Sequence, residues 1–433
     1  MQRRRFMGLA ALGMVSAIGL SAAGCGNDSK AGGDVTLKVV VADYGTPGSA
    51  NSSKGYWDDL VRAFEEKGGH DGVKVDVTVL SWEEVDDKVA EMVKAGEAPD
   101  IAQIGAYADY AASDKLYSAS ELLSIPVHAD IIPALAQAGE LGRVQYGLPF
   151  VSSTRLLFYN KALFTEAGLD PAKPPTSWDE LQSAAEALRA AGVKHPYGLP
   201  LGPEEAQAES MMWMLSGGGG YTDNVNTYTL DSNENVKTFT WLRDEFVGKG
   251  LTGPGSPGKT NRQQLFDAFS RGEVGMLNGH PTLMQQAAKG KVDYGTAPLP
   301  GREGEAGATM GVADWIMGFK QNGHREQIGA FLDFVFSTEQ HYTFTDRYDL
   351  LPVTTSASEK MLDDKKHKDL WPFLEQLGAA EFYPVNKVSW AATSAEVKKS
   401  IGRAVEKGTD PQAVLTSLQR RAETEEAAAR ARR

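Results

Sequence analysis

Cysteine is almost absent from this chain, since Cys25 is the one cysteine among its 433 residues. A single thiol cannot form an intramolecular disulfide, a zinc-binding cluster or a redox pair. Stability must therefore come from hydrophobic burial, and a chain of this length is expected to divide into two domains. After residue 24 no apolar run approaches the length that a membrane-spanning helix needs.

Positive charge is also in deficit, with 44 Lys and Arg against 57 Asp and Glu and a formal net charge of −13. Nucleic acids and anionic membrane surfaces both attract proteins through cationic side chains. An acidic surface therefore argues against either as a partner.

Catalytic motifs are missing as well. The chain has no His-Glu-x-x-His zinc helix and no Gly-x-Ser-x-Gly elbow, and its seven histidines are scattered. One segment, Gly253 to Thr260, matches the phosphate-binding loop pattern. We interpret it as an ordinary loop, because a helix over 236–247 is expected before it and two prolines remove backbone N–H donors. We expect no cofactor and no bound metal.

What the chain does have begins at its N-terminus. Three arginines, Arg3 to Arg5, precede an apolar run that extends from Phe6 to Ala23, and small residues then lead to Cys25. This order is typical of a lipoprotein signal peptide over residues 1–24, with Cys25 as the lipidated N-terminus of the mature protein. Residues 25–34 are polar and rich in glycine, which predicts a flexible tether.

Two alternatives stay open at this end of the chain. The apolar run could be an uncleaved membrane anchor, although that would leave the cysteine after small residues unexplained. The arginines also resemble a twin-arginine signal, so export could follow either that route or the general secretory route.

Strand and helix patterns alternate along the rest of the chain. Strands are expected at 35–42, 73–80, 100–104, 155–159 and 312–319, and helices at 58–67, 82–95, 177–188, 236–247, 262–271 and 327–336. The tail from 395 to 430 is expected to form two helices that break at 408–411. Such alternation predicts an α/β fold with a mainly parallel sheet. Gly217 to Gly220 is interpreted as a mobile loop or a helix C-cap.

Several segments occur in an order that resembles one protein family. They are Tyr146–Arg155, Leu157–Lys161, Phe164–Asp170, Pro174–Leu181, Phe266–Gly279, Leu351–Val353 and Tyr383–Trp390. Together they resemble the family 1 extracellular solute-binding proteins of ABC importers, whose best-known members bind maltose or glycerol phosphodiesters. The resemblance covers nearly all of residues 35–425.

The resemblance implies a two-lobe, periplasmic-binding-protein-like fold (type II) with discontinuous lobes joined by a hinge. The N-terminal lobe would contain 35–152 and 313–350, and the C-terminal lobe 153–312 and 351–430. The chain would cross between lobes near 152–156, 312–316 and 348–353. A ligand would be captured between the lobes and would shift an open–closed equilibrium.

Sugar-binding sites combine aromatic faces with planar polar groups, and the resemblance nominates residues for both roles. Trp390 stands where sugar-binding members carry a stacking tryptophan, and core packing is the alternative. Trp315 and Asp314, at a crossing, would supply a ring and a hydroxyl acceptor.

Further candidates follow strands or border loops of the expected site. Tyr44 and Tyr107 follow the first and third strands, where carboxyl ends of strands meet ligands, and Trp82 opens a helix at the same edge. His280 replaces an aromatic residue of maltose-binding members, and Glu209 and Trp213 precede the glycine run. Each of these residues could instead pack in the core.

A phosphate-binding alternative rests on Ser153 and Arg155, because the Ser152–Thr154 triplet resembles the glycerol-phosphate binders. Those proteins also hold phosphate with an arginine near the Tyr383–Trp390 region, where this chain has Lys387, and lysine does not reproduce a bidentate arginine contact. Arg155 and Arg347 could compensate, but an acidic surface would not attract an anion. We therefore favour a neutral di- or oligosaccharide.

The sequence predicts a binding protein without enzymatic activity, monomeric and tethered outside the membrane. Its partners would be a sugar, the membrane permease subunits and, across the membrane, a cytoplasmic ATPase. An exported glycoside hydrolase would need two carboxyls about 5–10 Å apart, and Asp314 and Glu209 are the pair we could nominate. A role in feeding a membrane sensor is also open.

Overall fold

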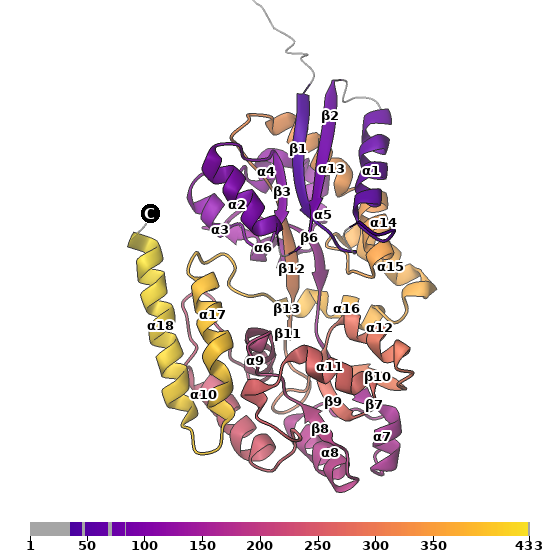
Figure 1. Ribbon diagram of the computed structural model, residues 1–433, viewed down its shortest axis with the longest axis vertical. Helices are drawn as coiled ribbons and strands as arrows, with labels where there is room; N and C mark the ends of the chain where they lie inside the picture. Colours follow the sequence, from indigo (N-terminus) through magenta and orange to yellow (C-terminus); the bar gives the residue numbers. More distant parts are fainter. Residues whose placement is uncertain (1–34, 46–47, 68–71, 83, 432–433) are drawn as a thin grey trace, which may run out of the picture.

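Two separate β-sheets organise the computed structural model, one above the other in Figure 1. The structure describes residues 35–45, 48–67, 72–82 and 84–431, so the expected signal peptide, Cys25 and the tether lie outside the described residues. Within the described ranges, no helix combines the length and the apolar character that crossing a membrane requires.

The first sheet has five strands. Their order is β2 (Val73–Leu80), β1 (Val35–Ala42), β3 (Ile101–Ile104), β12 (Val312–Gly318) and β6 (Leu148–Ser153). β1 pairs in parallel with β2 and β3, as the strand–helix alternation predicts. β12 is antiparallel to both β3 and β6, so the sheet is mixed rather than mainly parallel. The prediction of a mainly parallel sheet missed this because β12 comes from a distant part of the chain.

The pleat of β1 separates two cores. Leu37, Val39 and Val41 pack with α1 (Lys54–Glu66) and α13 (Arg325–Val335), whereas Val40 and Ala42 pack with α2 (Val85–Ala95). Because successive side chains of a strand point to opposite faces, a continuous apolar run predicts a strand covered on both sides. Helices on the two faces of the sheet satisfy this requirement.

The second sheet has four strands. Their order is β10 (Tyr294–Ala297), β7 (Leu156–Asn160), β9 (Val274–Gly279) and β8 (His195–Gly198). β7 is antiparallel to β9 and β8 is parallel to it, so the start of β7 and the ends of β8 and β9 share one edge. α9 (Ala206–Ser216) follows β8 and α12 (Pro281–Lys289) follows β9, whereas α11 (Arg262–Ser270) comes directly before β9.

Three chain segments run side by side between the two sheets. Ser153 at the end of β6 pairs with Val312 at the start of β12, and Ser152 forms a bridge with Leu351 after α14 (Thr338–Tyr348). These are the three crossings that the resemblance implies, and β6 and β12 can be followed in Figure 1 toward the lower half of the molecule. The residue boundaries of the two lobes stay a prediction.

Most of the expected elements are confirmed, with shifted ends. The strands at 35–42 and 73–80 have the expected bounds, whereas α1 begins at Lys54 and α2 begins at Val85. The helix expected over 236–247 is α10 (Asn233–Trp241) continued by a π-helical segment, Leu242–Val247. Because a helix precedes Gly253 to Thr260, that segment lacks the strand of a phosphate-binding loop, as expected.

Helix ends follow the local chemistry. Ser177 caps α8 (Trp178–Ala190) by accepting from the Glu180 N–H at 3.3 Å, but the Glu180 carboxylate accepts from the Thr176 N–H instead of closing a capping box. Gly217 is the C-cap of α9, and Gly218 has a φ of +79°, which confirms the C-cap interpretation. The tail forms α17 (Trp390–Ser400) and α18 (Pro411–Ala431), two packed helices in Figure 1.

Candidate functional site

Polar side chains of the four-stranded sheet gather where β7 starts and β8 and β9 end. Arg155 directly precedes β7, Asn278 lies near the end of β9, and His280 precedes α12. Glu209 lies in the first turn of α9, whose N-terminus follows the loop after β8. Ends of elements far apart in the sequence thus bring the predicted Arg155, Glu209 and His280, together with Asn278, to one small cavity.

Two arginines at this cavity are already paired with carboxylates. The buried Arg155 lies 3.6 Å from Glu205 and donates to Ser153 Oγ at 3.0 Å. Arg262, at the start of α11, contacts Glu205 at 2.5 Å and Glu204 at 2.9 Å. Burial lowers the pKa of Arg155, and the Glu205 charge acts against that shift. The paired charges leave the cluster close to neutral.

Glu209 is the most enclosed acid of the cluster, with 2% of its surface exposed. Its Oε1 accepts from Trp213 Nε1 at 2.8 Å and from Asn278 Nδ2 at 3.2 Å. Burial raises the pKa of Glu209 to about 8, although both hydrogen bonds act in the opposite direction. Trp213 is itself buried, and its hydrogen bond fixes the position of the Glu209 carboxyl group.

His280 enters the cluster as a neutral ring. Its Nε2 accepts from Arg262 at 2.7 Å, which leaves Nδ1 to donate to Thr282 Oγ1 at 2.9 Å. Burial and the charges of Arg155 and Arg262 hold the pKa of His280 well below its ordinary value. The ring packs beside Phe266, with centroids 5.2 Å apart.

Three aromatic rings adjoin the cluster. Trp390, 8% exposed, stacks on Tyr383 with centroids 5.3 Å apart and lies 5.0 Å from Tyr221. Tyr383 interacts electrostatically with Glu205 and Arg155, which links the rings to the paired charges. Our sequence reasoning did not single out Tyr383, although it lies in the 383–390 run that carries the resemblance.

The five-stranded sheet places a second group of predicted residues at its corresponding end. Tyr44 follows β1 and donates its hydroxyl proton to Asp314 Oδ2 on β12 at 2.8 Å, and Gln103 Nε2 donates to the same hydroxyl at 3.1 Å. Trp82 packs edge-on against Tyr44 at 5.5 Å and is 39% exposed. Burial raises the pKa of Asp314 to about 6.

Tyr107 and Trp315 are placed differently from our expectation that their rings face a ligand. They are 0% and 2% exposed and pack against each other at 5.3 Å, and the Tyr107 hydroxyl donates to the Ala138 carbonyl at 2.7 Å. Because successive residues of β12 point to opposite faces, Trp315 turns into the core when Asp314 turns out. Neither ring offers a free face in this structure.

Arg347 and Lys387 do not join the cluster. Arg347 is exposed on α14 and lies over Tyr348. Lys387 Nζ donates to the Asn226 carbonyl at 2.8 Å, contacts Glu426 of α18 at 3.3 Å and lies over the Tyr228 ring. These contacts tie the segment before Trp390 to the C-terminal helix and occupy the ammonium group.

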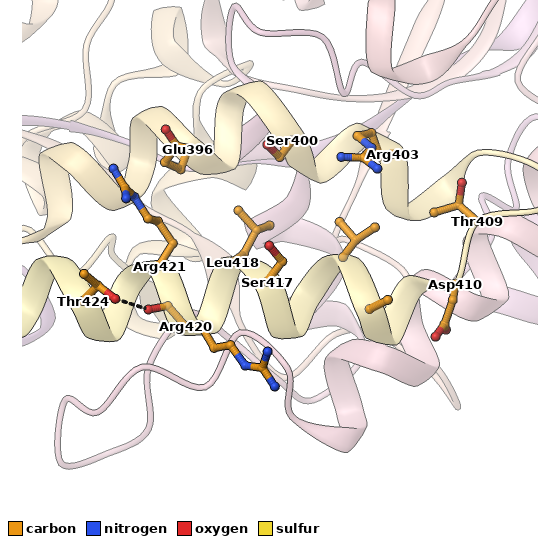
Figure 2. A pocket seen from close by; sticks show the side chains of 12 residues that line it. Glu396, Ser400, Arg403, Thr409, Asp410, Ser417, Leu418, Arg420, Arg421 and Thr424 are labelled. Carbon is orange, nitrogen blue, oxygen red and sulfur yellow. Dashed lines mark hydrogen bonds between the residues drawn. The ribbon is translucent and has the colours of Figure 1, made fainter.

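A separate groove lies between α17 and α18 (Figure 2). Leu418 and Arg421 point from α18 toward α17, whereas Arg420 points away, so the charged groups do not converge on one point. Arg421 is paired with Glu425 at 3.2 Å. Among the described residues, no group of three or more His, Cys, Asp or Glu side chains could hold a metal ion, in this groove or elsewhere.

Comparisons with known proteins agree with the two-sheet architecture. The cyclic α-maltosyl-1,6-maltose-binding protein of Arthrobacter globiformis superimposes with a TM-score of 0.76 at 20% identity, covering 91% of this chain and 99% of that one. At this identity the likeness concerns the fold alone.

Two relatives are similar in sequence. A Brucella abortus protein described as a binding protein is 28% identical over 355 residues, covering 81% of this chain and 83% of that protein. The sn-glycerol-3-phosphate-binding periplasmic protein of Salmonella typhimurium is 28% identical over 230 residues, about half of each chain.

The sequence profile of a whole family also matches. It is the family of bacterial extracellular solute-binding proteins, and the match covers residues 49–342. This segment contains the first two crossings and the residues of both groups described above, except Tyr44, Tyr383 and Trp390. The chain therefore belongs to the family of bacterial extracellular solute-binding proteins.

Proposed function

We propose that this protein captures an uncharged di- or oligosaccharide between its two lobes and delivers it to the membrane permease of an ABC importer. It acts as a monomeric receptor, and a cytoplasmic ATPase drives the transport. Membership of the family supports the receptor role. The structural similarity to a protein named for a cyclic maltosyl-maltose ligand supports carbohydrate as the solute.

The observation that carries the choice of a neutral ligand is the pairing of Arg155 and Arg262 with Glu204 and Glu205. An anionic ligand would have to displace these carboxylates, and Asp314 on the other sheet adds further negative charge. Hydroxyl groups can exchange hydrogen bonds with such paired charges without disturbing the balance. Trp390 and Tyr383, beside the same cluster, would supply apolar faces for the sugar ring.

The second candidate ligand is a glycerol phosphodiester or polyol phosphate. It is favoured by the contact of Arg155 with Ser153 and by the relative that is named for sn-glycerol-3-phosphate. In this alternative the phosphate would compete with Glu205 for Arg155.

The protein acts outside the cytoplasm, anchored to the cell membrane by a lipid on Cys25. The basic, apolar and small-residue order of residues 1–25 supports this placement. In this proposal the protein has no catalytic step, and Glu209 and Asp314 bind rather than hydrolyse.

Calorimetric titration of residues 26–433 with maltose, maltotriose, other mono- and oligosaccharides and glycerol phosphodiesters tests the proposal. We expect saturable binding of a neutral sugar. Loss of the Trp390 ring in Trp390→Ala should weaken it by roughly 1–3 kcal/mol, about 5- to 150-fold in affinity.

Trp371→Ala is the matched control, because Trp371 lies on α16 (Trp371–Glu375) and donates to the Met361 carbonyl instead of joining the rings near Trp390. Thermal unfolding of both variants verifies that they fold. Binding of the phosphodiesters alone would replace our ligand class by the second candidate, and binding of neither class would refute both.

A further inference from the structure

The small cavity beside Arg155 has room for about one water-sized group, so it fits a single oxygen atom of a ligand rather than a sugar ring. Its walls include the paired arginines, Glu209, Asn278 and His280. Glu209 is a buried wall residue whose hydrogen-bonding capacity is incompletely used.

The hydrogen bonds of Glu209 are asymmetric. Both N–H donors, from Trp213 and Asn278, reach Oε1, and in the part of the chain that the structure describes Oε2 forms no hydrogen bond. In a neutral carboxyl group one oxygen is a carbonyl acceptor and the other carries the proton and donates. This pattern assigns Oε1 as the carbonyl oxygen and leaves Oε2 to donate into the cavity.

The groups around Glu209 favour its neutral form. Arg155 and Arg262 are engaged by Glu205 and Glu204, His280 is neutral, and Glu205 repels a second negative charge. Tyr197 on β8 also faces Glu209 and is fully buried. The two N–H donors and the charge of Arg155 favour the ionised form, but burial outweighs them and raises the pKa of Glu209 to about 8.

The geometry points to a specific role: Glu209 is a neutral hydrogen-bond donor that recognises one hydroxyl or ring oxygen of the bound saccharide in this cavity. The inference rests on the proposed function, which supplies the class of ligand. It adds that Glu209 selects ligand groups that can accept a hydrogen bond. An uncharged oxygen accepts the Oε2 proton, whereas an ammonium group has no lone pair to accept it.

Two measurements test the inference, and the first needs no ligand. The carboxyl carbons of ¹³C-glutamate-labelled protein are followed by NMR from pH 5 to 10, and the Glu209 signal is assigned by its absence in Glu209→Gln. We expect this carboxyl to titrate near pH 8. A Glu209 carboxyl that is ionised at pH 7 would overturn the inference whatever the ligand proves to be.

The second measurement is calorimetric, with maltotriose or another sugar of the panel that binds. Wild-type affinity should be constant up to about pH 8 and fall above it as the donor is lost. The fall should be absent in Glu209→Gln, whose amide N–H₂ donates at every pH. Glu209→Met, which has no donor, should bind about tenfold more weakly than Glu209→Gln.

Glu66→Gln is the control, because Glu66 is exposed at the end of α1, and it should keep the wild-type pH profile. A pH-independent affinity in the wild type, or equal affinities of the Gln and Met variants, would overturn the donor role. These results differ from failure of the proposed function, in which no sugar binds the wild type at any pH.

Discussion

At the scale of single residues, buried titratable side chains determine how this protein responds to pH. His341 on α14 is fully buried, and its Nε2 accepts the Val353 N–H at 3.0 Å beside the third crossing. Its Nδ1 has no hydrogen-bond partner among the described residues. A charged imidazole would therefore lose its hydration without compensation.

We expect His341 to make the protein sensitive to acid. Burial lowers the pKa of His341 from 6.5 to about 3. The unfolded chain therefore binds a proton at higher pH than the folded chain does, and the stabilisation present above pH 6.5 is lost as pH falls toward 3. The loss amounts to at most about 5 kcal/mol of unfolding free energy.

Urea unfolding at pH 7 and pH 4 measures this effect. His341→Gln keeps an acceptor for Val353 but cannot be protonated, so it should lose less unfolding free energy between the two pH values than the wild type. Equal losses in both proteins would contradict the prediction. His128→Gln is the control, because His128 is only part-buried and contacts Gln145.

At the scale of elements, α9 is the central buried helix of the lobe that contains the four-stranded sheet. All eleven of its residues are buried, and it carries both Glu209 and Trp213. Its C-terminal glycines allow close packing on α10, because a Cβ at Gly217 would overlap Thr238 Oγ1 and one at Gly219 would overlap Asn235 Oδ1. These glycines therefore allow tight packing on α10 and also cap α9.

Gly217→Ala should consequently lower the unfolding free energy by about 1–3 kcal/mol, through overpacking against Thr238. Denaturant unfolding measures it. Gly307→Ala is the matched control, because a Cβ there would meet nothing within 4 Å and should change stability by no more than about 0.5 kcal/mol. Equal effects at the two positions would argue against tight packing at the end of α9.

Element boundaries show where sequence patterns suffice. The β1 and β2 strands have the expected bounds because their apolar and alternating runs are local signals. α1 begins four residues before the expected Asp58, because Tyr56 and Trp57 are buried against distant residues that the local pattern does not contain. The Glu180 carboxylate likewise accepts from the Thr176 N–H rather than from the N–H of the N-cap residue Ser177. The sequence motif alone does not distinguish these two neighbouring donors.

At the scale of the whole molecule, two sheets joined by three adjacent segments provide the architecture for opening and closing around a solute. The N-terminal pattern concerns where the molecule works rather than how it folds. The proposed lipid anchor would keep the receptor close to its permease.

Cys25→Ser tests that anchor. The variant should lose lipid labelling with radioactive palmitate and move from the membrane fraction to the soluble fraction or the medium, because the thiol is the acceptor of the lipid. Ser29→Ala, in the expected tether, should stay with the membrane. A Cys25→Ser protein that remains in the membrane fraction would instead support an uncleaved anchor.

The sequence by itself determined the family, the α/β class and the positions of most strands and helices, because these depend on local periodicity and on the order of short motifs. Only the tertiary structure decided which candidate side chains are free, paired or buried. Tyr44 meets Asp314 across 270 positions, whereas Tyr107 and Trp315 bury each other, and Arg155 is neutralised by Glu205 from another loop. Burial and charge pairing arise from contacts between distant segments, so no local pattern encodes them.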